Sequence, residues 1–109
     1  MGLRESLPEV ICDIPGPQTR ELLTRRDSSV PRALCTMTYP VFVRRGAGAM
    51  IEDVDGNRFL DWIGGVGVLN IGYTHPEVVA AVRDQAGRYF HALFNIIGHE
   101  GYVELAERI

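Results

Sequence analysis

The sequence predicts an α+β fold made of an extended arm, a three-stranded antiparallel meander and two helices. Between Val41 and Trp62, short apolar runs alternate with turn signals, which is typical of neighbouring β-strands. From Val78 onward, apolar residues recur every three or four positions, which is typical of an amphipathic helix. Upstream of both patterns, prolines interrupt any regular period. The sequence therefore places the arm first, the sheet second and the helices last.

Composition favours a folded domain and excludes several partner classes. The 109 residues are 46% hydrophobic and 23% charged, with a formal net charge of -3, which is ordinary for a folded domain. The eleven basic residues are all arginine and are scattered, so we expect no nucleic-acid partner. The longest weakly polar run, residues 62–73, is broken by glycine and too short to span a bilayer. Cys12 and Cys35 lack metal-ligand spacing, so we expect free thiols and no bound metal. Free thiols are typical of a reducing compartment, so we expect a cytoplasmic protein, and without a membrane-spanning run we expect no membrane partner.

The N-terminal third should carry little regular structure. Residues 1–18 are predicted to form a tail, because prolines and a glycine interrupt it. A polar helix is predicted from Thr19 to about Asp27, since Pro17 suits a helix start. Residues 28–40 contain two further prolines and are predicted to be an extended arm.

The meander is predicted to turn at glycines. A first turn is expected at residues 46–48 and a second at Asp55–Gly56, where glycine supplies the positive φ of a tight hairpin. Carboxylates at Asp53 and Asp55 suggest a calcium loop, but the glycine and glutamate positions of such a loop do not match, so a hairpin turn is preferred. Residues 64–72 follow as a flexible apolar loop whose glycine spacing fits no phosphate-binding motif.

Two amphipathic helices complete the predicted fold. Thr74 and Glu77 stand three apart in the pattern of a capping box, so a helix is expected to begin there. Its apolar face recurs from Val78 to Leu93, which predicts about four turns. A second helix is predicted to open near Gly101. Its apolar stripe still runs where the sequence ends, so we expect a piece of a longer polypeptide.

Several segments, taken in order, resemble the opening of the class III aminotransferases. They are Val54–Asp61, Gly64–Gly72 and His75–Val82, and the likeness continues through Phe94–Asn95 and Glu100–Ala106. The resemblance covers about residues 16–109, and its specificity comes from the order of the linked segments.

Membership in that class would imply a homodimer of fold type I, an α/β architecture that binds pyridoxal phosphate. Residues 19–109 would then form the N-terminal part of its small domain, truncated at the C-terminus. The class moves an amino group from a donor amino acid to 2-oxoglutarate. Within the class, Val68–Asn70 and Ser29–Arg32 most resemble the members that use 4-aminobutyrate. The resemblance thus implies an ω-amino donor, 4-aminobutyrate first, with ornithine, acetylornithine or another ω-amino acid as alternatives.

By position in the resemblance, Val66 and Asn95 would line the pocket for the donor chain. Val66 would act by bulk, leaving slightly more room than the isoleucine common in relatives, and Asn95 by hydrogen bonding. The structural alternatives are packing for Val66 and helix termination for Asn95.

The chemistry implied by the resemblance needs a lysine amine that forms an imine with the cofactor. The sequence contains no lysine. No catalytic or cofactor-binding residue is therefore predicted in this chain, and the chain alone is expected to be inactive. A non-catalytic binding or assembly module, docking through a sheet edge and two amphipathic helices, is the alternative from another class.

Overall fold

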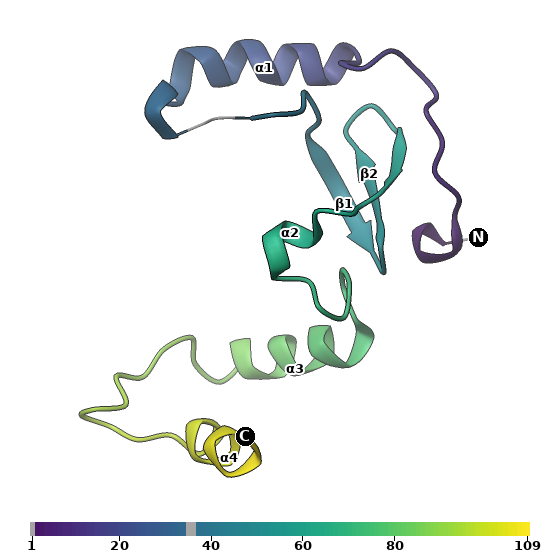
Figure 1. Cartoon of the computed structure of the whole chain (residues 1–109). Helices are drawn as coiled ribbons and strands as arrows, with labels where there is room; N and C mark the ends of the chain where they lie inside the picture. The colour runs from purple at the N-terminus through teal and green to yellow at the C-terminus, as the bar shows by residue number, and fades with distance from the viewer. Residues whose placement is uncertain (1, 35–36) are drawn as a thin grey trace. The chain divides into compact units, whose positions relative to one another are not determined.

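The computed structural model of the protein describes residues 2–34 and 37–109, which form two compact units (Figure 1). The first unit extends to His75 and holds the 3-10 turns η1 (Leu3–Glu5) and η2 (Arg32–Leu34), the helices α1 (Pro17–Ser29) and α2 (Gly64–Gly67), and the strands β1 (Val43–Ala47), β2 (Met50–Asp53) and β3 (Arg58–Leu60). The second unit holds α3 (Pro76–Ala86) and α4 (Glu100–Arg108). The predicted α+β fold is confirmed, whereas Cys35 lies outside the described residues.

The three strands form the predicted antiparallel meander in the order β1-β2-β3. The first turn is tighter than expected: Ala47 pairs with Met50, so Gly48 and Ala49 alone connect β1 to β2. Gly46, predicted to be a turn residue, lies inside β1. Its missing side chain makes room for an aromatic ring, because a Cβ at this position would lie 2.6 Å from Cγ of Tyr73.

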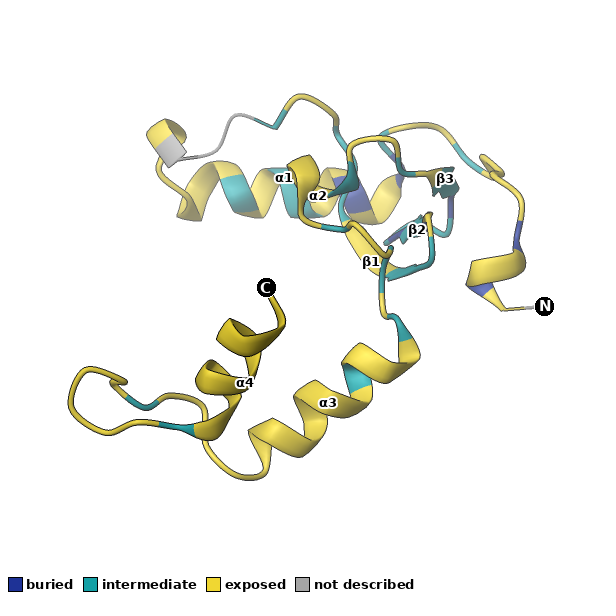
Figure 2. Ribbon diagram, turned by 60° about the horizontal axis from the view of Figure 1, so that its bottom comes forward, coloured by how far each residue is buried: buried dark blue, intermediate teal, exposed yellow. Residues whose placement is uncertain are grey.

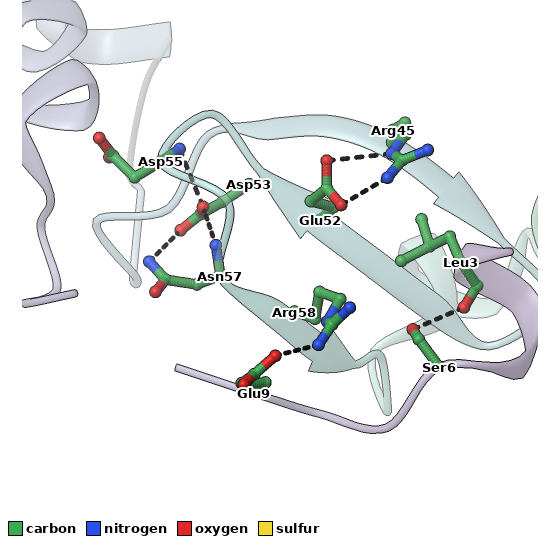
Figure 3. A network of polar contacts seen from close by, with 9 residues as sticks. All are labelled: Leu3, Ser6, Glu9, Arg45, Glu52, Asp53, Asp55, Asn57 and Arg58. Atoms are coloured by element: carbon green, nitrogen blue, oxygen red, sulfur yellow. Dashed lines mark hydrogen bonds and ion pairs between the residues drawn. The ribbon is translucent and has the colours of Figure 1, made fainter. Parts of the chain in front are cut away.

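The second turn holds two of the most deeply buried polar residues of the first unit. Asn57 is 0% exposed and Asp53 is 1% exposed. The Asp53 carboxylate accepts hydrogen bonds from the backbone N–H groups of Asp55 (2.9 Å) and Asn57 (2.8 Å) and from the Asn57 amide (2.9 Å), as Figure 3 shows. The predicted hairpin turn is confirmed, and both side chains are buried because their polar atoms are satisfied.

This turn also organises the chain that precedes the sheet. Oδ1 of Asn57 accepts hydrogen bonds from the N–H groups of Ile11 (2.8 Å) and Cys12 (3.1 Å). The Asp55 carboxylate accepts from the N–H groups of Gln18 (2.7 Å) and Thr19 (2.9 Å), in the first turn of α1. The residue before α1 is glycine and has no capping side chain. Asp55 therefore supplies from the sheet the cap that the helix lacks locally.

The N-terminal tail is bound to the sheet. Glu9 and Arg58 exchange two backbone hydrogen bonds, of 2.8 and 2.7 Å, and their side chains form an ion pair (Figure 3). Leu3 is buried, and a guanidinium nitrogen of Arg4 donates to the backbone oxygens of Tyr73 (3.3 Å) and Thr74 (3.2 Å). Tail residues thus contact both β3 and residues 73–74.

The predicted extended arm, residues 28–40, is helical in part. α1 continues to Ser29, and η2 begins directly after Pro31. The fixed φ of proline fits the first turn of a helix as well as an extended chain. The prolines therefore did not exclude a helical turn, and the prediction was wrong for these residues.

α3 begins at Pro76, close to the predicted start, but the capping box is wrong. Thr74 has a φ of 50°, whereas an N-cap residue is extended, and its hydroxyl donates to the Gly46 carbonyl at 3.0 Å. The helix also ends at Ala86 instead of near Leu93. Gly87 interrupts the apolar period there, and glycine disfavours a helix by about 1 kcal/mol relative to alanine.

α4 begins where the sequence predicted a helix. His99 caps it, because its Nδ1 accepts a hydrogen bond from the N–H of Tyr102 at 3.3 Å. Both α3 and α4 are exposed along most of their length (Figure 2). Among the described residues, none of the helices has the length and apolar character that crossing a membrane requires.

Candidate functional site

Residues 62–72, here called the glycine loop, leave the sheet and return to it at one place. Before the loop, the N–H of Asp61 donates to the Ala49 carbonyl at 2.8 Å. After the loop, Tyr73 forms a two-way backbone bridge with Gly48, with bonds of 2.7 and 3.0 Å. Both ends of the loop are therefore fixed to the turn between β1 and β2.

One carboxylate closes the base of the glycine loop. The hydroxyl of Tyr73 donates to Oδ2 of Asp61 at 2.6 Å. Oδ1 of Asp61 accepts from the N–H groups of Ile63 (2.8 Å) and Gly64 (3.1 Å), which are among the first residues of the loop. A single side chain thus joins the residue that follows the loop to two residues near its start.

The hydrogen bond between Tyr73 and Asp61 moves the pKa of each group further from neutral pH. The Tyr73 hydrogen bond lowers the pKa of Asp61, with burial opposing it and the N–H groups of Ile63 and Gly64 adding to it. The same bond, with burial, raises the pKa of Tyr73 to about 12. Asp61 is therefore ionised and Tyr73 neutral across the physiological range. Neither group is suited to general acid–base catalysis, which favours a pKa near the working pH.

A cavity of about 710 Å³ lies beside this pair. Its lining is mainly apolar and aromatic, with contributions from residues 37–41, from Ile51 and Phe59 on the strands, and from Trp62 and Ile63 of the glycine loop. Asp61 and Tyr73 are among its lining residues, and their polar side-chain groups are bonded to each other. Such a cavity suits the alkyl part of a ligand, and its anionic carboxylate disfavours a phosphate group.

The two residues predicted to contact a donor lie in different units. Val66 is 85% exposed, so it does not pack into a core of the described residues. Asn95 is exposed and lies in a turn well beyond the end of α3, so it does not terminate that helix. Neither residue lines the cavity, although Gly65, beside Val66, does. In the described part of the chain, no cluster of His, Cys, Asp and Glu could hold a metal ion.

The pair of Asp61 and Tyr73 was not predicted from the sequence. The available signal was their position: one polar residue directly follows the last strand and another follows the last glycine of the loop. Because a loop between neighbouring anchor points brings its ends together, side chains at those ends are candidates for a direct contact.

Titration of Tyr73 should show the pair directly. We expect a tyrosinate absorbance step near pH 12 in the 109-residue chain, absent from Tyr73→Phe. Because the pKa of Tyr73 is raised from 10.0, its contribution to stability is fully present below pH 10 and is lost as pH rises toward 12. Asp61→Asn should move the step toward pH 10, since the carboxylate hydrogen bond is the main cause of the shift. An unchanged step in Asp61→Asn would show that the hydrogen bond is absent in solution.

Comparison with known proteins assigns the chain to a family. The model of the family Aminotransferase class-III matches residues 33–109. The chain is 44% identical over 105 residues to a 4-aminobutyrate aminotransferase of Mycobacterium leprae, covering 96% of the chain and 23% of that relative. It is 42% identical over 88 residues to a 5-aminovalerate aminotransferase of Pseudomonas aeruginosa, covering 81% of the chain and 20% of that relative.

A solved structure gives the same assignment. The N-acetylornithine aminotransferase of Stenotrophomonas maltophilia superposes with a TM-score of 0.63 at 30% identity, over 79% of this chain and 21% of that one. The chain thus spans less than a quarter of the length of these relatives. The predicted resemblance and fold class are confirmed: the chain belongs to the class-III aminotransferase family.

Proposed function

We propose that the enzyme to which this chain contributes transfers an amino group from an ω-amino acid, with 4-aminobutyrate as the first candidate, to 2-oxoglutarate. The observation that carries the proposal is the 44% identity, over 96% of the chain, to a relative named for 4-aminobutyrate. The 42% identity to a relative named for 5-aminovalerate supports a second donor with one more methylene. In both donors an alkyl chain carries the primary amine, and an apolar cavity wall accommodates that alkyl chain.

Pyridoxal phosphate is the cofactor that the family implies, but the residues of this chain do not fit it. An imine needs a lysine, and the 109 residues contain none. The cavity beside Asp61 also offers an ionised carboxylate where a phosphate would need cationic or N–H donors. We infer that the cofactor is held by segments outside these residues, in a cytoplasmic homodimer. Residues 19–109 would contribute to its small domain.

Within that enzyme, Val66 and Asn95 are the proposed donor contacts of this chain. The exposure of both side chains supports this role, because each is available to another surface or to a ligand. Val66 would act by bulk, and Asn95 by hydrogen bonding.

The test is a chimera in which residues 1–109 replace the matching segment of the Mycobacterium leprae relative. We expect glutamate to form from 2-oxoglutarate with 4-aminobutyrate or 5-aminovalerate, and less with ornithine or acetylornithine. Val66→Ile should lower kcat/KM for 5-aminovalerate relative to 4-aminobutyrate by about tenfold, since one methylene in an apolar pocket changes discrimination by that order. A chimera that folds and binds the cofactor, yet uses no ω-amino donor or prefers an α-amino donor, would contradict the proposal. Folding with no transfer at all would favour the binding module.

A further inference from the structure

The backbone of Val66 has a conformation that a valine rarely adopts. Its φ is 59° and its ψ is 60°, in the left-handed region. A β-branched side chain is disfavoured there by contact with its own backbone. Such a residue persists only where the surrounding structure holds it. The side chain is 85% exposed, so packing among the described residues does not supply that restraint.

Hydrogen bonds at the base of the glycine loop supply the restraint on the Val66 backbone. The N–H of Val66 donates to the Ile63 carbonyl at 2.9 Å, and the N–H of Val68 donates to the Gly64 carbonyl at 3.1 Å. The N–H groups of Ile63 and Gly64 are in turn held by Oδ1 of Asp61. A continuous series of hydrogen bonds therefore runs from the Asp61 carboxylate, through the peptide group that joins Ile63 to Gly64, to Val66.

Tyr73 fixes the carboxylate that begins this series. Its ring lies against Gly46, and its backbone is paired with Gly48, so its hydroxyl is held in place by the sheet. The hydroxyl occupies Oδ2 of Asp61, which leaves Oδ1 directed to the N–H groups of the loop. Without that bond, only the N–H groups of Ile63 and Gly64 would orient the carboxylate.

We propose that Asp61 and Tyr73 are positioning residues, which lock the base of the glycine loop and thereby hold Val66 in the conformation that the donor chain meets. Only the last step, contact between Val66 and the donor, rests on the proposed function. Neither residue needs to touch the reacting atoms, because each acts through the peptide groups of Ile63 and Gly64.

The lock is tested in the 109-residue chain by amide hydrogen exchange. Tyr73→Phe and Asp61→Ala should each accelerate exchange at Ile63, Gly64 and Val66 by about tenfold, as expected when a hydrogen bond of roughly average strength is lost. Asp61→Asn should stay within about threefold of wild type, because its amide oxygen still accepts from the loop and its NH₂ group donates to the tyrosine oxygen. Tyr102→Phe, on α4, is the matched control. Unchanged exchange in both Tyr73→Phe and Asp61→Ala would overturn the lock.

The effect on the donor is tested in the chimera. Tyr73→Phe and Asp61→Ala should lower the ratio of kcat/KM for 4-aminobutyrate to that for 5-aminovalerate by about fivefold, because a mobile Val66 discriminates chain length less well. Asp61→Asn should restore the ratio, which a general loss of folding would not produce. If the chimera is active and neither Tyr73→Phe nor Asp61→Ala changes the ratio of kcat/KM for the two donors, the positioning role is overturned. A chimera inactive with every donor would refute the proposed function. The exchange data alone would then test whether Asp61 and Tyr73 hold the base of the glycine loop.

Discussion

Gly72→Ala is expected to destabilise the first unit by about 3 kcal/mol, through backbone strain and overpacking together. Gly72 has a φ of 80°, which disfavours any residue with a Cβ. A Cβ there would also lie 2.6 Å from the carbonyl oxygen of Gly48 and 2.9 Å from its carbonyl carbon. These are backbone atoms of the bridge to Tyr73, so no side chain can move aside. Urea denaturation of the 109-residue chain measures the loss.

Gly67→Ala is the matched control for this prediction. Its φ of 77° is nearly the same, but no atom lies within 4 Å of an added Cβ. It should therefore cost only the strain of the left-handed region, about 1–2 kcal/mol. The difference between the two variants isolates the close contact with Gly48. Equal losses of stability in both would mean that the glycine loop does not return to the turn between β1 and β2 in solution.

The elements predicted correctly are those with strong local signals. Asp55–Gly56 marks a hairpin by chemistry that acts within a few residues, and the second turn lies there. α4 has a sustained apolar period and begins next to the predicted position. Such signals depend on neighbours in sequence, so they can be interpreted without the tertiary structure.

The predictions that failed concern features decided by distant contacts. Gly46 was expected to turn the chain, but the ring of Tyr73, which lies against it, requires its small size. Thr74 was expected to cap α3, but its hydroxyl bonds Gly46 instead. α1 begins at Pro17, before the predicted Thr19, because Asp55 caps it from a turn far along the chain. Local propensity cannot reveal a partner that only the fold brings near.

The candidate site also depends on features that the local sequence does not indicate. Val66 and Asn95 could be named only from resemblance, since nothing in their local sequence indicates a ligand contact. The bond between Asp61 and Tyr73 depends on both ends of the glycine loop meeting at Gly48 and Ala49. That meeting requires the register of the sheet, which sets the two-residue turn between β1 and β2.

Asn57→Ala is expected to be the most damaging polar substitution, at about 3–4 kcal/mol, because it removes the hydrogen-bond partner of the buried Asp53 and of two backbone N–H groups at once. The side chain is 0% exposed. Its loss leaves the N–H groups of Ile11 and Cys12 and one oxygen of Asp53 without their partner. The tail should detach as well, so limited proteolysis should cut near residues 11–16 faster, while urea denaturation reports the free energy of unfolding.

Two further variants separate the possible causes. Asn57→Asp keeps an acceptor for the tail but replaces the amide that donates to Asp53 with a second carboxylate, so it should destabilise by like-charge repulsion. Asn70→Ala removes an exposed asparagine of the glycine loop and should change stability by less than about 0.5 kcal/mol. If Asn57→Ala were as mild as Asn70→Ala, the tail would not be bound through this turn, and the first unit would have to be held together by its few buried apolar residues instead.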